Sequence, residues 1–210
     1  MTVEFVHCTP NAEALIVKMA RVSNPDNENN LATAPKLLRY LIDHHHWSPF
    51  QMANLCVQIH TERDISAQIL RHRSFSFQEF STRYAEARPA IIPELRKQDL
   101  KNRQNSTDDL DFNTKTYYAE QIRNQYADIK ELYDQMIADG VAKECARRIL
   151  PLSTQTTLYM NGCLRSFIHY IKVRTDASTQ LEHRLIATEI KKIFCEQFPI
   201  IGQAAFDAND

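Results

Sequence analysis

The stretch from residue 68 to residue 84 gathers the side chains that could do chemistry. It reads QILRHRSFSFQEFSTRY, so three arginines and a histidine lie close together, with a carboxylate and several hydroxyls between them. One interpretation is a solvated charged surface, which is the usual setting for neighbouring arginines. Arg71, however, follows Ile69 and Leu70 at the end of an apolar helix face, which predicts that part of the cluster lies at a cleft wall. Guanidinium groups bind phosphate through forked donors, while Ser81 and Glu79 can bind a sugar or a base edge.

The shortage of glycine limits how a phosphate could be held. The chain has only three glycines in 210 residues, Gly140, Gly162 and Gly202, and no two are close together. A Walker-type loop and the dinucleotide-binding fingerprint both need several glycines in a short run, because the backbone must approach the phosphates closely. The sequence therefore excludes both motifs. Any bound nucleotide must be held mainly by side chains and helix N-termini.

Composition and charge exclude several other classes. The chain has 25 Lys and Arg against 26 Asp and Glu, a net charge of −1, so no global field attracts nucleic acid or membrane. It shows no export signal and no apolar run long enough to span a bilayer, and we expect a cytoplasmic protein without nucleic-acid or membrane partners. Its five cysteines form no C-x-x-C motif, which favours reduced thiols over a disulfide scaffold.

The elements that must position this chemistry follow from hydrophobic periodicity. Alternation predicts strands at residues 2–8, 54–61 and 153–161. Helical spacing predicts helices at 11–21, 35–44, 64–70, 112–139, 143–150, 162–175 and 179–198. Asp64 is predicted to cap one helix, and Thr179 with Glu182 to form a capping box for the last. The sum is an α+β fold: a single helix-rich domain, residues 1–210, with a small, mostly antiparallel sheet flanked by long helices and a polar surface insertion at about 94–111.

The arginine-rich segment also resembles a family signature. Arg71-His72-Arg73, seven further residues, and then Ser81 through Tyr84 as S-T-R-Y is similar to the signature of the flavin-dependent thymidylate synthases. Further matches in the same order are His46-x-Ser48-Pro49-Phe50, Arg147 before Pro151-Leu152, and Leu164-Arg165-Ser166 leading to Val173-Arg174. The resemblance extends from about residue 12 to residue 200, apart from the polar insertion.

The resemblance implies an activity. The family are methyltransferases that convert dUMP to dTMP in de novo dTMP biosynthesis. They take the one-carbon unit from 5,10-methylenetetrahydrofolate and the hydride from NADPH through bound FAD. They are homotetramers whose active sites are shared between chains. No metal is implied.

The resemblance also implies roles for individual residues. The expected dUMP-binding residues are Gln68, Arg71, Glu79, Phe80, Ser81, Thr82, Arg83, Arg147 and Arg174. The expected FAD-binding residues are Ser48, Arg71, His72, Arg73, Glu79, Arg165 and His169. The expected catalytic residues are Arg174, which would favour the N3-ionised uracil by its fixed positive charge, and His46 and Tyr84, which would line the reaction cavity. Departures from the family pattern at Cys163, His169, Gln51 and Met52 concern flavin and folate contacts.

Other interpretations remain open at this point. Ser81 could be a nucleophile, but no histidine is placed by the sequence to activate it, so we interpret it as a substrate ligand. The run His44-His45-His46 could suggest a metal, but consecutive helical side chains point about 100° apart and cannot share one ion. The interleaved arginines and phenylalanines would suit an RNA-binding module, and the apolar stripe at 122–136 a structural interaction protein.

Overall fold

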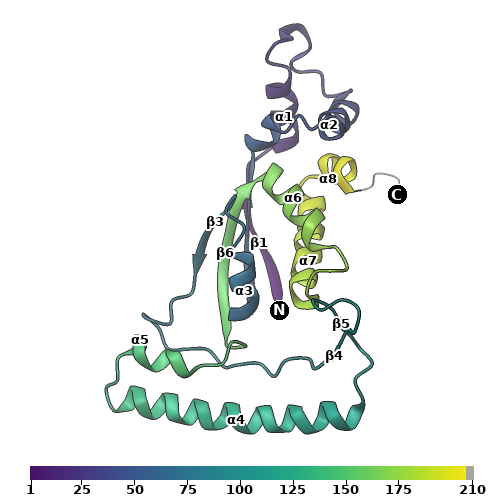
Figure 1. Ribbon diagram of the computed structural model, residues 1–210. Helices are drawn as coiled ribbons and strands as arrows, with labels where there is room; N and C mark the ends of the chain where they lie inside the picture. The colour runs from purple at the N-terminus through teal and green to yellow at the C-terminus, as the bar shows by residue number, and fades with distance from the viewer. Residues whose placement is uncertain (207–210) are drawn as a thin grey trace.

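The computed structural model describes residues 1–206, and its centre is a four-stranded antiparallel sheet (Figure 1). The strands are β1 (Thr2–Cys8), β2 (Asn54–Glu62), β3 (Ser76–Glu79) and β6 (Gln155–Cys163), in the order β1-β2-β6-β3. β2 and β6 pair without interruption, from Asn54 opposite Cys163 to Glu62 opposite Gln155. The α+β prediction with a small antiparallel sheet is confirmed, while β3 was not predicted as a strand.

The sheet has one apolar and one polar face because the central strands alternate as expected. On one face, Leu55, Val57 and Ile59 of β2 are fully buried. Val57 pairs with Met160 and Ile59 with Leu158 of β6, and these two residues are fully buried as well. The opposite face is polar: His60 bonds through Nδ1 to Thr157 Oγ1 at 2.8 Å and through Nε2 to the Gln58 amide at 2.7 Å. Cys56 departs from the alternation, since its position in the strand belongs to the polar face and yet it is buried.

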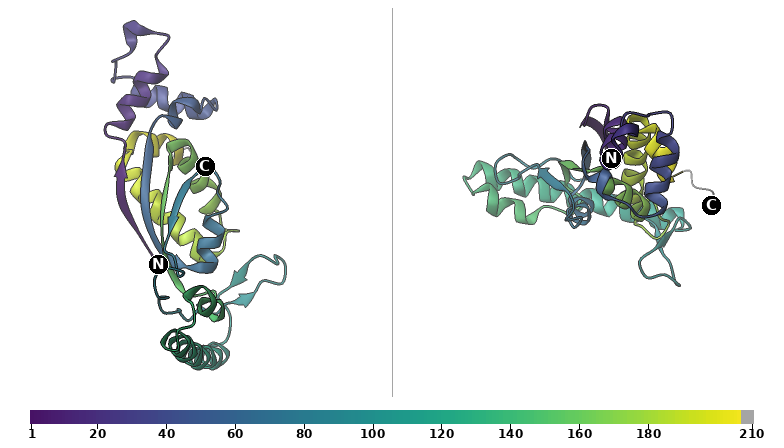
Figure 2. Two further views of the ribbon diagram at one scale, coloured as in Figure 1. Left: turned by 90° about the vertical axis from the view of Figure 1, so that its left-hand side faces the viewer. Right: turned by 90° about the horizontal axis from the view of Figure 1, so that it is seen from above.

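Helices cover the apolar face (Figures 1 and 2). α3 (Arg63–Ile69), α6 (Leu164–Arg174) and α7 (Leu181–Gln197) pack against the sheet and share one core with it. α1 (Ala12–Ala20), α2 (Ala34–Asp43) and α8 (Pro199–Phe206) extend this core at one end. Short 3₁₀ turns lie at Pro25–Asn27, Ser48–Gln51 and Arg147–Ile149. α8 was not predicted as a separate helix.

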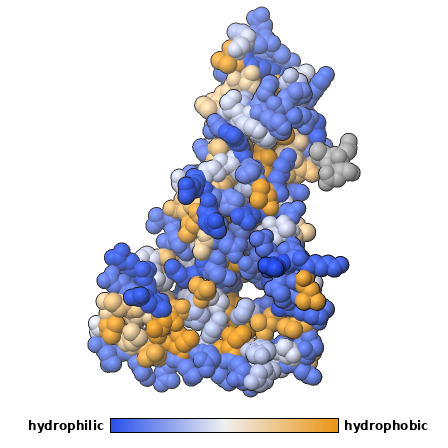
Figure 3. Space-filling view, viewed as in Figure 1, coloured by the Kyte–Doolittle hydropathy of each residue, from blue (hydrophilic) through white to orange (hydrophobic). Residues whose placement is uncertain are grey.

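The longest helix, α4 (Phe112–Ala138), lies at the opposite end of the molecule from α1 and α2, next to the short α5 (Lys143–Ala146) (Figure 1). Its predicted ends are confirmed: the Asp111 carboxylate accepts from the Thr114 N–H at 2.9 Å, and Gly140 follows the helix with φ 85°. Its apolar stripe is not core, because Tyr133 is its only buried residue among those described. Apolar atoms gather on the surface at this end (Figure 3).

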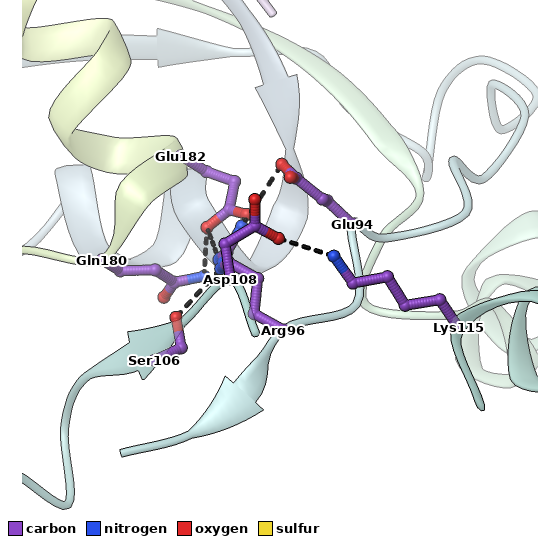
Figure 4. A network of polar contacts seen from close by, with 7 residues as sticks. All are labelled: Glu94, Arg96, Ser106, Asp108, Lys115, Gln180 and Glu182. Atoms are coloured by element: carbon purple, nitrogen blue, oxygen red, sulfur yellow. Dashed lines mark hydrogen bonds and ion pairs between the residues drawn. The ribbon is translucent and has the colours of Figure 1, made fainter. Parts of the chain in front are cut away.

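The polar segment 94–111 forms a hairpin with two-residue strands, β4 (Lys97–Gln98) and β5 (Ser106–Thr107). Most of it is exposed, as expected of an insertion. Arg96 is one of its partly buried residues: its side chain is only 11% exposed and pairs with Glu182 at the start of α7 (Figure 4). The hairpin is therefore fixed to the helical layer by a largely buried ion pair.

Several predicted details are wrong at the ends of helices. Glu62, not Asp64, occupies the N-cap of α3, and Asp64 lies inside the first turn. The capping box at α7 does not form, because Gln180 is the N-cap and the Thr179 hydroxyl donates to the Val173 carbonyl at 3.3 Å. Leu70, expected on an apolar helix face, is 37% exposed.

The start of α6 also differs from the prediction. Gly162 belongs to β6, and α6 begins at Leu164. A Cβ at Gly162 would stand 2.4 Å from Phe75 Cδ1, so glycine is required there by the close approach of an aromatic ring. Gly162, which was expected to begin a helix, instead leaves room for the Phe75 ring to pack against β6.

Candidate active site

Arg174 and His72 form the centre of the site. Arg174 is in the last turn of α6, His72 follows α3, and the Arg174 Nε–H donates to His72 Nε2 at 2.9 Å. Burial, followed by the charges of Arg174 and His169, lowers the pKa of His72 to about 4. His72 is therefore neutral at physiological pH and can accept this hydrogen bond. Within residues 1–206 the two terminal nitrogens of Arg174 make no hydrogen bond or ion pair, so they are available to a ligand.

Behind this pair lies a buried polar group that sequence reasoning missed. His183 is fully buried in α7. Its Nε2 lies 3.0 Å from the Tyr170 hydroxyl and its Nδ1 lies 3.3 Å from Gln68 Oε1. Burial, then the charges of Arg174 and His72, lowers its pKa to about 3. In the sequence, His183 precedes Ile186 and Ala187 at helical spacing, but this local pattern does not show the partners that bury it.

Glu79 is held at the end of β3. One of its oxygens accepts from Ser66 Oγ at 2.9 Å and from Thr156 Oγ1 at 3.0 Å, so the carboxylate faces the helical side of the sheet. The next residue, Phe80, donates its backbone N–H to the Thr157 carbonyl at 2.8 Å. This pairing fixes the direction in which the chain leaves the sheet towards residues 81–84.

A second cationic group lies beside α5. A cavity of about 430 Å³ is lined by Ser81, Arg83 and Tyr84 together with residues 142–144. Arg83 pairs with the Glu144 carboxylate at 3.3 Å, and Arg147 Nη1 lies 3.4 Å from the buried Thr82 hydroxyl. The predicted residues Ser81, Thr82, Arg83, Tyr84 and Arg147 are thus brought together. Hydroxyls and guanidiniums in an open cavity can bind a phosphate.

A third group surrounds a cavity of about 580 Å³. Its lining includes the predicted residues Arg165 and His169, the indole of Trp47, and Lys172, and no carboxylate. Cations beside an indole and histidine rings suit a pyrophosphate and a stacked ring system, so these residues fit a dinucleotide such as FAD. Ser48 follows Trp47 at the start of a 3₁₀ turn.

The predicted residues do not form one continuous site within a single chain. His46 is exposed after α2, where its ring contacts that of Tyr40, while Tyr84 is 88% exposed near α5 at the other end of the molecule (Figure 1). Arg71 and Arg73 are exposed between them, and their guanidiniums have no partner in the described part of the chain. Within one chain, the cationic side chains therefore form separate, partly exposed groups on a sheet covered by helices. Such an arrangement is typical of an α+β protein that binds anions.

Comparison with known proteins identifies the family. Residues 4–200 match the family model described as thymidylate synthase complementing protein. The chain is 50% identical over 194 residues to a probable flavin-dependent thymidylate synthase of Paramecium bursaria Chlorella virus 1, covering 92% of this chain and 90% of that protein. It is also 50% identical over 192 residues to the flavin-dependent thymidylate synthase of Synechocystis, covering 91% and 88%.

The fold agrees with this match. The crystal structure of a UMP/dUMP methylase, PolB, from Streptomyces cacaoi bound with 5-Br dUMP superposes with a TM-score of 0.84 at 25% identity, covering 97% of this chain and 93% of that one. The chain belongs to the flavin-dependent thymidylate synthase family. It is a flavin-dependent enzyme that converts dUMP to dTMP, and the resemblance stated from the arginine-rich signature is confirmed.

Proposed function

We propose that the enzyme takes its one-carbon unit from 5,10-methylenetetrahydrofolate and its reducing equivalents from NADPH, and acts as a homotetramer with shared active sites. The observation that carries the shared site is the separation of the predicted residues. His46 and Tyr84 lie at different ends of one chain, although both are expected in the same reaction cavity. A second copy of the chain would bring the half-sites together.

The long helix supports an oligomer. α4 leaves Phe112, Tyr117, Tyr118 and Leu132 at least half exposed, and apolar atoms gather at this end of the molecule (Figure 3). Exposed apolar patches of this kind mark protein interfaces. Four cysteines, Cys8, Cys56, Cys145 and Cys163, are free thiols, which supports a reducing cytoplasmic location. Among the helices of residues 1–206, none has the length and apolar character needed to cross a bilayer.

The uridylate would be held by two groups of side chains. We assign its phosphate to Ser81, Arg83 and Arg147: Ser81 and Arg83 line the open cavity beside α5, Arg147 contacts Thr82 between them, and the two guanidiniums carry forked donors. Arg71 offers a further guanidinium without a partner in residues 1–206. Glu79, Gln68 and the backbone of Phe80 and Thr82 would bind the sugar and the base, as the family resemblance implies.

Arg174 would activate the pyrimidine. Carbon C5 of uracil is a poor nucleophile, and a fixed positive charge near N3 favours the ionised ring. A guanidinium supplies such a charge through fixed N–H donors, and the Nε–H of Arg174 is already bound to neutral His72, so the orientation of Arg174 is set before substrate arrives. Its free terminal nitrogens supply two parallel donors to the ring.

The flavin would be held by Arg165 and His169 at the cavity beside Trp47, with Ser48, Arg73 and His72 nearby. FAD held there would supply the redox chemistry that links NADPH to the methyl transfer. The protein's part is to neutralise the pyrophosphate with guanidiniums, which replaces the glycine-built phosphate loops that this chain lacks.

Two measurements test the proposal. Purified protein should show a flavin absorption band that bleaches with NADPH, whereas colourless protein that retards RNA would support the RNA-binding alternative. Arg174→Ala should fold and keep its flavin but lose about 100-fold or more in the rate of dTMP formation, as expected for loss of a transition-state donor. Full activity in that variant would remove Arg174 from its assigned role.

A matched pair tests the phosphate cavity. Arg147→Ala should raise the KM for dUMP by about tenfold or more, since a charged donor to the phosphate is lost. Arg148→Ala is the control, because Arg148 is the exposed neighbour on the same turn and, within residues 1–206, has no hydrogen bond or ion pair to the residues around the cavity. Equal effects of the two substitutions would place the phosphate elsewhere.

A further inference from the structure

A continuous chain of polar contacts joins the 94–111 hairpin to Gln68. Arg96 Nη2 lies 2.7 Å from one oxygen of Glu182 and 3.0 Å from the other. Gln180 Nε2 donates to Glu182 at 3.0 Å, and Gln68 Nε2 donates to Gln180 Oε1 at 2.7 Å. Figure 4 shows the hairpin end of this chain, with Arg96 between Glu182 and Ser106.

The hydrogen bonds of this series of contacts all run in one direction, and the Glu182 carboxylate fixes that direction. An ionised carboxylate can only accept hydrogen bonds, so Gln180 must turn its NH₂ group towards Glu182 and its oxygen towards Gln68. Gln68 must then turn its own NH₂ group towards Gln180 and its oxygen towards His183 Nδ1. Neutral His183 completes the chain, because its Nδ1–H donates to Gln68 and its Nε2 accepts from the Tyr170 hydroxyl. Every contact agrees with this direction.

Arg96 keeps Glu182 in the form that this polarity needs. Burial acts to raise the pKa of Glu182, but hydrogen bonds from its own backbone N–H, from Arg96 and from Gln180 together hold it below the ordinary value. A second carboxylate, Asp64, lies close by with one oxygen buried and without a hydrogen bond in the described residues. Without the guanidinium, two carboxylates would share this partly buried region, and repulsion would favour protonation of one of them.

The ion pair of Arg96 and Glu182 contacts the helical layer only along the path that leads through Gln180 to Gln68, among the described residues. Arg96 also contacts Ser106 at 2.9 Å and Glu94 at 3.5 Å, both within its own segment, so within residues 1–206 Glu182 is its one link to the helical layer. The Arg96 side chain is 11% exposed and that of Glu182 19%, so solvent screens the pair far less than the surface pair of Lys97 and Asp109, at 50% and 60%.

We propose that Arg96 is a positioning residue for uridylate binding: by pairing with Glu182 it fixes the orientation of the Gln180 and Gln68 amides, so that Gln68 meets the substrate as a hydrogen-bond donor. The inference rests on the proposed role of Gln68 as a dUMP ligand. One Gln68 N–H is bound to Gln180, and the other stays available to an acceptor on the nucleotide. The polar insertion therefore contributes to the site without touching the substrate.

The test measures dUMP binding to the flavin-loaded enzyme by titration calorimetry. Arg96→Met should raise the Kd for dUMP by about tenfold while kcat at saturating dUMP stays within about threefold of the unmodified enzyme, because Gln68 is misoriented and the reacting groups are untouched. Arg96→Lys, which keeps the charge, should restore most of the affinity. Lys97→Met is the matched control, since it removes an ion pair of the same hairpin that does not reach α7, and it should leave Kd unchanged.

A second variant acts further along the chain. Gln180→Met removes the side-chain amide that links Glu182 to Gln68 but leaves the ion pair of Arg96 and Glu182 intact. It should therefore raise the Kd for dUMP by the same factor as Arg96→Met. The double variant should be no weaker than either single one, because both act through one path. Additive losses, an unchanged Kd in Arg96→Met, or an equal loss in Lys97→Met would overturn the inference. Failure of the unmodified enzyme to bind dUMP would overturn the proposed site as well, which separates the two conclusions.

Discussion

Acidification should destabilise the protein through His183 before most carboxylates titrate. The imidazole is fully buried in α7, where its two nitrogens are engaged by the Tyr170 hydroxyl and the Gln68 amide. A proton on Nε2 would remove the acceptor for Tyr170 and place a charge close to Arg174. The pKa of His183 accordingly falls from 6.5 to about 3 in the folded chain.

The size of the effect follows from proton linkage. Because the folded pKa is lowered, the unfolded chain binds more protons between about pH 6.5 and about pH 3, and stability is lost as the pH falls through this window. At about pH 5 the unfolded imidazole is some 1.5 pH units below its pKa while the folded one stays neutral. Each unit is worth about 1.4 kcal/mol, so His183 alone removes about 2 kcal/mol relative to about pH 7.5. This value changes little for any folded pKa below about 4.

Urea unfolding at the two pH values, at one protein concentration, measures this quantity. His183→Gln is the comparison, because an amide can accept from Tyr170 but does not titrate. The loss of unfolding free energy on acidification should be about 2 kcal/mol smaller in the variant than in the unmodified chain. An equal pH dependence in both proteins would refute the assignment of a neutral, buried His183.

Two further predictions concern stability. Gly162→Ala should lower the free energy of unfolding by about 1–3 kcal/mol, because its Cβ would meet the packed Phe75 ring at 2.4 Å. Gly140→Ala should lower it by only about 1 kcal/mol, because the site has free space and only its φ of 85° is unfavourable. Equal losses in denaturant titrations would contradict the steric explanation. Arg21→Met should expose residues 22–33 to proteolysis and cost about 2 kcal/mol, because the buried guanidinium donates to the Asn27 and Asn30 carbonyls and to the Thr33 hydroxyl; cleavage at the unmodified rate would contradict this.

The elements with strong periodicity were predictable from the sequence. The alternation at residues 54–61 and the helical spacing at 112–139 gave β2 and α4 with nearly their observed ends. The errors lie where tertiary contacts overrule local signals. Thr179 and Glu182 have the spacing of a capping box, but Arg96 binds the carboxylate and Val173 accepts from the hydroxyl. No local pattern could reveal the partner of Glu182, because Arg96 lies 86 residues away in the sequence.

The site was predictable as a set of residues but not as an arrangement. The signature residues 71–84 marked the arginines, and the structure places Arg83 near Arg147 and His72 against Arg174. The buried His183 and its chain of amides could not be read in advance, because a His-Arg pair looks the same on a surface and in a core. Which face of α7 is buried depends on the sheet, which the sequence of the helix does not contain.

The pairing of β2 with β6 constrains how the chain is made as well as how it is held. Residues 63–154 lie between the two strands, so the centre of the sheet can close only after Cys163 has left the ribosome. Until then the apolar face of β2 is not covered by α6 and α7. During this interval the exposed apolar surface makes the nascent chain prone to misfolding and aggregation. Once the sheet is closed, the connection tolerates changes in length, since removing the 18 residues 94–111 would change its closure entropy by only about 0.2 kcal/mol. As far as the sheet is concerned, the length of this hairpin is therefore almost free, and the constraint on it comes from its contacts, such as the pair of Arg96 with Glu182.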